Sequence, residues 1–177
     1  MSTGWNLALL LLRCVVGVTM FLHGYNHIWG GGKIAGTAGW FESLGLKPGI
    51  LHAWLASLTE LVCGPLLILG LLTPLGAAGV VGVMAVAFLP NHRPNGFFIF
   101  RPGEGYEYVL NLFVAGVALG GLGAGEWSLD HALKLPFDPA TFNSLTGLLI
   151  ALVAGLGGAL VLLAVFWRPE KKAAADA

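Results

Sequence analysis

Residues 5–29 read WNLALLLLRCVVGVTMFLHGYNHIW and contain one formally charged side chain, Arg13. A transmembrane helix needs about 20 predominantly apolar residues, so this stretch is long enough to cross a bilayer. A cleavable signal peptide would place positive charge before its apolar run, whereas here Arg13 interrupts the run. We therefore predict a membrane helix that stays in the mature protein.

The composition of the whole chain agrees with a membrane protein. Of its 177 residues, 56% are hydrophobic and 10% are charged, and the mean hydropathy is +0.81. Soluble domains carry about 25% charged residues, so the few charges here cannot cover a water-facing surface. The lipid bilayer is the expected environment, and the net charge of +0 gives no reason to expect nucleic acid as a partner.

Four more apolar segments follow the first, which predicts an all-α, polytopic transmembrane helix bundle. The segments are 50–72, 75–89, 105–122 and 145–167. Pro74 suits the first turn of the third helix, which is short and which we expect to stop at Pro90. Between the first two segments, residues 37–44 read as a short interfacial helix with Thr37 as its cap. Its Trp40 and Phe41 would lie in the headgroup layer.

The distribution of Lys and Arg predicts the orientation. With five spans, the N-terminus and the 123–144 loop share one side, which carries only Lys134. The opposite side carries Lys33, Lys47, Arg93, Arg101, Arg168, Lys171 and Lys172. Because cytoplasmic loops are enriched in Lys and Arg, we expect the N-terminus outside and the C-terminus in the cytoplasm. The membrane would be the bacterial plasma membrane.

Small residues recur at helical spacing and predict close contacts between helices. They are Gly147, Ala151, Gly155 and Ala159 in the last segment and Gly116 and Gly120 in the fourth.

Polar residues also gather on particular helix faces. At about 100° per residue, Arg13, His23 and His27 fall within one sector of the first helix, and Glu60 lies on a stripe of small residues in the second. The fourth segment opens with Glu104, Glu107, Tyr108 and Asn111 on one face. Charged groups at membrane depth are costly, so we expect these groups to meet in one cleft open to the cytoplasmic side. We also expect Arg13 to form a structural ion pair with Glu60.

Several motifs resemble the DoxX family of small membrane proteins, in the same order along the chain. They are Arg13, Phe21-Leu-His-Gly24, Gly39-Trp-Phe-Glu-Ser-Leu-Gly-Leu46, Leu58-Thr-Glu-Leu61 with Gly64, Leu69-Gly-Leu-Leu-Thr-Pro74, Asn95-Gly-Phe-Phe98, Gly105-Tyr-Glu-Tyr108 and Trp127-Ser-Leu-Asp130. Together they cover roughly residues 7–131. The resemblance implies a four-helix membrane core and a family often described as oxidoreductase subunits. Its members include DoxD-type subunits of thiosulfate:quinone oxidoreductase and proteins linked to quinone resistance. Another member is the membrane partner of two enzymes, a superoxide dismutase and a sulfurtransferase, in a mycobacterial complex.

The chain departs from the family pattern in two places. A fifth span follows Asp130, and the usual lysine after the histidine-glycine pair is matched only loosely, by His27 or the later Lys33. The expected organisation is a DoxX-like domain over residues 1–131, an extracytoplasmic loop over 132–144, an added span over 145–167 and a cytoplasmic tail over 168–177.

Our leading hypothesis is a redox subunit that binds a quinone or a similar small apolar ligand. His23 and Glu60 would be the catalytic pair, since a quinone needs hydrogen-bond donors and a route for protons. His27, Trp40, Phe41, Glu107, Tyr108 and Asn111 would line the ligand site. No covalently bound cofactor is expected, because the sequence has no dinucleotide, iron–sulfur or haem-attachment motif.

Two alternatives remain open, and we assign no metal site. The first is a haem or metal protein, using His23 and His27 with Glu60 or Glu107, or His27 with His92. The second is a non-enzymatic scaffold or assembly factor of a membrane complex. Other protein subunits, or further copies of the chain, are expected partners in either case.

Overall fold

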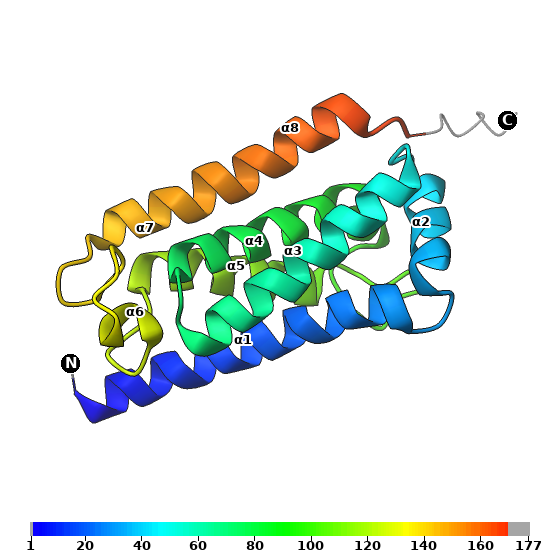
Figure 1. Ribbon diagram of the computed structural model, residues 1–177. Helices are drawn as coiled ribbons and strands as arrows, with labels where there is room; N and C mark the ends of the chain where they lie inside the picture. Colours follow the sequence, from blue (N-terminus) through cyan, green and yellow to red (C-terminus); the bar gives the residue numbers. More distant parts are fainter. Residues whose placement is uncertain (1, 170–177) are drawn as a thin grey trace, which may run out of the picture.

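The computed structural model describes residues 2–169, and the regular elements in that range are helical (Figure 1). They are α1 (Thr3–Trp29), α2 (Lys33–Ser43), α3 (Gly49–Leu69), α4 (Thr73–Ala87), η1 (Phe88–His92), η2 (Arg93–Asn95), α5 (Glu107–Leu122), α6 (Leu129–Ala132), α7 (Ser144–Ile150), η3 (Ala151–Leu156) and α8 (Gly157–Phe166). The end of the predicted cytoplasmic tail, including Lys171 and Lys172, lies outside the described residues.

Four helical stretches are long and apolar enough to cross a membrane, which confirms the helical membrane bundle. They are Thr3–Trp29, Gly49–Leu69, Thr73–Asn95 and Ser144–Phe166. Helix α5 has 16 residues, or about 24 Å at 1.5 Å per residue, and packs beside α4 and α7. That α5 also spans the bilayer stays a prediction.

The helical path of α4 does not stop at Pro90 as predicted. It continues through the π-helical turn η1 and the short 3₁₀ turn η2, so the whole stretch reaches Asn95. In an α-helix a proline ring collides with the carbonyl four residues earlier; the wider π turn relieves that crowding. Pro74 does occupy the first turn of α4, as expected.

The helix α2 starts earlier than the sequence indicated. It begins at Lys33 after Gly32, and Thr37 is not its cap. Instead the Thr37 hydroxyl donates to the carbonyl oxygens of His27 at 2.9 Å and Lys33 at 3.2 Å. This threonine therefore fastens α2 to the end of α1, and α2 lies across the end of the bundle (Figure 1).

Glycines bring α1 and α3 into direct backbone contact. A Cβ on Gly17 would lie 2.6 Å from the carbonyl oxygen of Gly64, and a Cβ on Gly24 would lie 2.8 Å from that of Ser57. The predicted contacts of the later helices are confirmed in the same way. A Cβ on Gly120 would lie 2.6 Å from the Cβ of Ala151, so α5 packs closely against the C-terminal helix.

Arg13 is fully buried, but it does not pair with Glu60, so that prediction is wrong. Its guanidinium donates to the carbonyl oxygens of Leu67 at 3.1 Å, Ile68 at 3.3 Å and Trp127 at 2.6 Å. The last carbonyls of a helix are short of hydrogen-bond partners and attract a cation; at the end of α3, Leu67 O accepts from the N–H of Gly70 as well as from Arg13. Glu60 lies about two turns before this end of α3, opposite His27.

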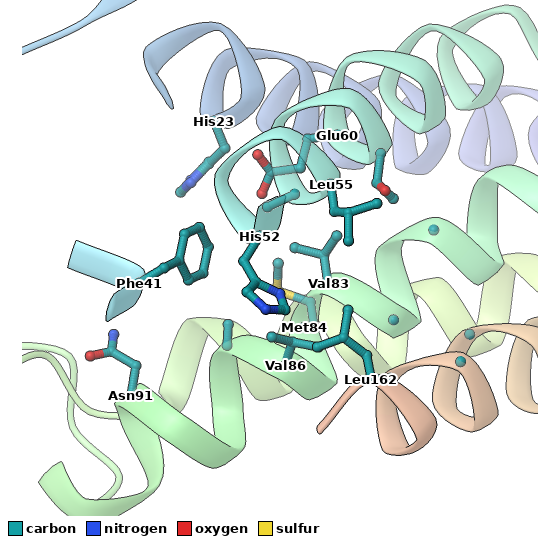
Figure 2. Close-up of a pocket in the computed structure, with 18 of the residues that line it drawn as sticks. His23, Phe41, His52, Leu55, Glu60, Val83, Met84, Val86, Asn91 and Leu162 are labelled. Atoms are coloured by element: carbon teal, nitrogen blue, oxygen red, sulfur yellow. The ribbon is translucent and has the colours of Figure 1, made fainter. Parts of the chain in front are cut away.

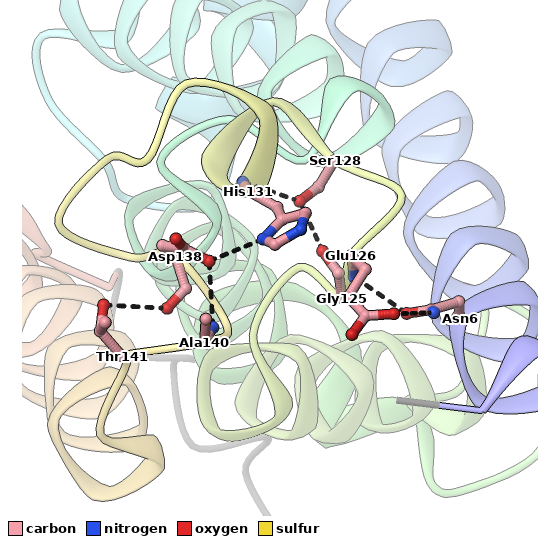
Figure 3. A network of polar contacts seen from close by, with 8 residues as sticks. All are labelled: Asn6, Gly125, Glu126, Ser128, His131, Asp138, Ala140 and Thr141. Atoms are coloured by element: carbon pink, nitrogen blue, oxygen red, sulfur yellow. Dashed lines mark hydrogen bonds and ion pairs between the residues drawn. The ribbon is translucent and has the colours of Figure 1, made fainter.

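At the same end of the bundle, the loop 123–143 is held by a second set of polar contacts (Figure 3). Asn6 donates to Glu126 Oε2 at 2.7 Å and accepts from its backbone N–H at 2.9 Å. His131 Nδ1 lies 2.8 Å from Asp138 Oδ1, which also accepts from the N–H of Ala140. The hydrogen bond to His131 holds the pKa of Asp138 below its ordinary value.

Candidate functional site

A cavity of about 360 Å³ opens at the α2 end of the bundle, within the range of about 300–1,000 Å³ typical of ligand sites. Its walls come from α1, α2, α3, α4, η1, α5, η3 and α8. The strongly polar residues that line it are His23, His27, His52, Glu60, Asn91, His92 and Tyr108. Figure 2 shows His23 and Glu60 near one another, with Leu55, Val83 and Leu162 further along the cavity.

The close packing of α1 on α3 brings His27 and Glu60 together. His27 Nε2 lies 3.3 Å from Glu60 Oε2. Glu60 is 3% exposed, and its Oε2 has no partner with hydrogen-bond geometry among residues 2–169. A buried polar atom without a hydrogen bond costs about 1–3 kcal/mol. Here that atom belongs to a residue lining a cavity, where a ligand could satisfy it by donating to the ionised carboxylate or by accepting from the protonated carboxyl.

A second polar group is built around the π-helical turn η1. His92 Nδ1 lies 2.9 Å from the carbonyl oxygen of Glu104, while its Nε2 lies 2.9 Å from the Tyr108 hydroxyl and 3.1 Å from Asn91 Nδ2. A carbonyl only accepts, so Nδ1 carries the proton and Nε2 accepts. His92 therefore orients Tyr108, whose ring stacks on His23 at 6.4 Å between centroids. Single π turns occur frequently at functional sites.

The helix α2 closes the end of the cavity with aromatic rings. Trp40 stacks on His27 at a centroid distance of 6.4 Å and an interplanar angle of 19°. Phe41 is buried and tilted against Trp40 at 5.0 Å. Both residues were predicted in the ligand site, and both line the cavity.

His52 also lines the cavity and was not predicted. It is 3% exposed, its ring meets Phe166 edge-on at 5.2 Å, and its Nε2 has no hydrogen-bond partner within the described residues. The sequence did contain a signal for it. His52, Ala56 and Glu60 follow each other every fourth residue, so they share one helix face.

Glu107 and Asn111 were predicted to line the site, but the structure does not bring them to the cavity. Glu107 Oε2 accepts from the backbone N–H of Ile99 at 3.2 Å, and Asn111 donates to the carbonyl of Glu107 at 2.9 Å. A helix turns about 100° per residue, so Tyr108 faces inward while its neighbour turns toward the 97–100 loop.

The three histidines named for the metal or haem alternative, His23, His27 and His92, all line the cavity. Within residues 2–169, no group of three or more His, Cys, Asp and Glu side chains is placed to hold a metal ion. Of the two histidines suggested for haem, His92 has its Nε2 hydrogen-bonded with Tyr108 and Asn91, while His27 Nε2 lies 3.3 Å from Glu60 Oε2 without hydrogen-bond geometry.

Charge is distributed unevenly between the two ends of the bundle. Lys33 begins α2, Lys47 precedes α3, Arg93 lies in η2, Arg101 lies between η2 and α5, and Arg168 follows α8. Lys134 instead follows α6, in the loop before α7. This distribution is the one from which a cytoplasmic position of the cavity end is predicted by the positive-inside rule, and that position stays a prediction.

The helices and the cavity define a class: an all-helical membrane protein with a polar site at one end of the bundle. The DoxX family model matches residues 8–93, so the chain carries a DoxX domain over these residues, a shorter region than the motifs indicated. It is 28% identical over 135 residues to the uncharacterized membrane protein Rv3486 of Mycobacterium tuberculosis, covering 72% of this chain and 82% of that protein. No solved structure matches the chain.

Proposed function

We propose that this DoxX-domain protein binds a quinone or a similar small apolar ring compound, as a subunit of a bacterial membrane redox system. The observation that carries the proposal is Glu60, a buried carboxyl with an unsatisfied oxygen in an otherwise largely apolar cavity. Ligand sites of this kind combine apolar walls with a few placed polar groups. The volume of about 360 Å³ suits one substituted ring.

The polar groups of the cavity match the two carbonyl oxygens of a quinone. We assign hydrogen bonding at one oxygen to His23, at the mouth of the cavity, and at the other to the protonated carboxyl of Glu60. Trp40 and Phe41 supply flat apolar surface for the ring, since aromatic rings favour offset stacking or edge contacts.

Reduction of a quinone to the quinol takes up two electrons and two protons. An electron-donating partner subunit would supply the electrons. Glu60 would release a proton to one ring oxygen and be reprotonated through His27, whose Nε2 lies 3.3 Å from the carboxyl. The second proton would enter at His23 from the open side. With the N-terminus outside and the C-terminus in the cytoplasm, these protons would come from the cytoplasmic side.

A binding titration tests the proposal. Quinones quench tryptophan fluorescence on contact, and Trp40 lines the cavity; decylubiquinone should therefore give saturable quenching of protein purified in mild detergent. Glu60→Gln and His23→Ala should each weaken binding by about tenfold, as expected for a lost hydrogen bond of about 1.4 kcal/mol.

Glu107→Gln is the matched control, because this carboxyl lies at the same end of the bundle but does not line the cavity. It should leave the affinity unchanged. Gel filtration of each variant checks that the protein stays folded. Absence of saturable quenching, or equal affinity of the Glu60 and Glu107 variants, would remove the proposal.

The scaffold alternative would need an exposed surface suited to a protein partner and not accounted for by contact with the membrane. The most prominent candidate is the exposed aromatic stretch of residues 97–100, in which Phe100 is 80% exposed. Aromatic side chains are enriched at membrane interfaces, and this stretch lies at the cavity end beside Arg101. Insertion into the headgroup layer accounts for it, so it gives no separate support for a scaffold.

A further inference from the structure

Beyond its polar end, the cavity continues as an apolar groove along α4. Its walls are Leu55 and Thr59 of α3, Gly79, Gly82 and Val83 of α4, and Ala154, Gly158 and Leu162 of η3 and α8. Its apolar floor from Gly79 to Ala87 measures about 12 Å at 1.5 Å per residue.

Small residues on α4 leave the groove open, because no side chains project from its floor at these positions. Gly79 lies against α3, where an added Cβ would be 2.7 Å from the Cβ of Cys63, and Gly82 lies against η3, where it would be 3.2 Å from the carbonyl oxygen of Gly155. The two walls of the groove, α3 on one side and η3 with α8 on the other, therefore both pack directly against α4. Ala154 and Gly158 are exposed, so the remaining side of the groove faces the bilayer.

We propose that this groove holds the long apolar tail of the ligand whose ring occupies the polar end, which makes a long-chain quinone the preferred substrate class. The inference rests on the proposed function. It also assigns a role to the C-terminal helix, the predicted addition to the family core, because η3 and α8 form one wall of the groove.

The groove selects the ligand by close packing around its tail, because moving an apolar tail from lipid into the groove gives little hydrophobic free energy. A tail arriving from lipid leaves an environment as apolar as the groove, so the gain comes from dispersion contacts with a fixed wall. The continuity of groove and polar cavity favours a molecule with a ring at one end and a chain at the other. An acyl chain of a membrane lipid has the same tail chemistry, and the experiment separates the two sources.

Gly158→Leu is the test variant, because an added Cβ at this position meets no atom within 4 Å and the position lines the groove. A leucine should fill the groove without disturbing the helix. Gly157→Leu is the matched control, since its Cβ also meets no atom within 4 Å while Gly157 does not line the groove.

The measurement compares decylubiquinone with the tailless parent benzoquinone on the same purified proteins. In the unmodified protein and in Gly157→Leu, the decyl compound should bind at least about fivefold more tightly, because the tail adds packing contacts. Gly158→Leu should lose this difference while binding of the tailless ring stays unchanged.

Three results would overturn the inference, and they are distinguishable. An equal preference for the tail in Gly158→Leu and the unmodified protein would place the tail elsewhere. A phospholipid retained in native mass spectrometry by Gly157→Leu but lost from Gly158→Leu, without any tail preference, would assign the groove to lipid. Absence of binding of either quinone to the unmodified protein would remove the proposed function itself.

Discussion

Asp130 gives the sharpest stability prediction, because one buried carboxylate fixes the start of α4 from far along the chain. Its side chain is fully buried. It accepts from the backbone N–H of Leu72 at 2.7 Å, and from both the backbone N–H of Thr73 at 3.0 Å and its hydroxyl at 2.9 Å. Asp130 also interacts electrostatically with Arg13, so it completes the polar core at this end of the bundle.

The substitution Asp130→Ala should lower the free energy of unfolding by about 3–5 kcal/mol. The backbone N–H groups of Leu72 and Thr73 lose their partner at about 1–3 kcal/mol each, which gives about 2–6 kcal/mol. The total agrees with the cost of removing one side of a buried charged contact. Thr73→Val is the control. It deletes only the hydroxyl bond and should cost about 1 kcal/mol.

Equilibrium unfolding in mixed micelles, followed by circular dichroism, measures both variants against the unmodified protein. The reasoning holds if Asp130→Ala is clearly the more destabilised of the two. It would be refuted if Asp130→Ala lost less than about 1 kcal/mol, or if the two variants were equally stable.

Three further predictions concern helix contacts and the loop 123–143. Gly120→Ala should lower the thermal unfolding temperature, because its Cβ would lie 2.6 Å from that of Ala151. Gly121→Ala is the control and should be tolerated, because its Cβ would meet its nearest atom at 3.5 Å. Equal unfolding temperatures of the two variants would contradict this prediction. Gly70→Ala should destabilise more than either, because φ is +62° and the new Cβ would meet the Arg13 guanidinium; an unchanged unfolding curve would count against the buried position of that arginine. The lowered pKa of Asp138 contributes stability that is present above its unfolded value of about 4 and is lost as the pH falls through the folded value. Asp138→Asn should therefore flatten the acid side of a stability–pH profile, and an identical profile would contradict the contact.

The fold class and the apolar helices could be predicted because lipid imposes simple requirements on length and composition. The five predicted segments correspond to α1, α3, α4 with η1 and η2, α5, and the helix from Ser144 to Phe166. Small residues likewise predicted contacts, since Gly120 meets Ala151 across a helix interface. The continuation through Pro90 could not be predicted, because it depends on a π turn that leaves no local sequence signal.

The convergence of polar side chains on one cavity was expected from the sequence, while their roles in a site stay a prediction, and the errors in their contacts have a common cause. His23, His27, Glu60 and Tyr108 meet as expected because membrane burial draws polar groups together. That argument says which groups avoid lipid but not which partner they find. Arg13 was assigned to Glu60 on depth alone, whereas the structure satisfies it with carbonyl oxygens at a helix end.

The central claim is that the cavity at the α2 end holds a quinone ring, and photolabelling tests it most directly. An azido-quinone should be irradiated with the purified protein and the labelled peptides identified by mass spectrometry. The account predicts labelling of Trp40, Phe41 and the α3 segment around His52, competed by decylubiquinone and reduced in Glu60→Gln. Labelling scattered over the lipid-facing helix surfaces, unaffected by competitor or by Glu60→Gln, would contradict it.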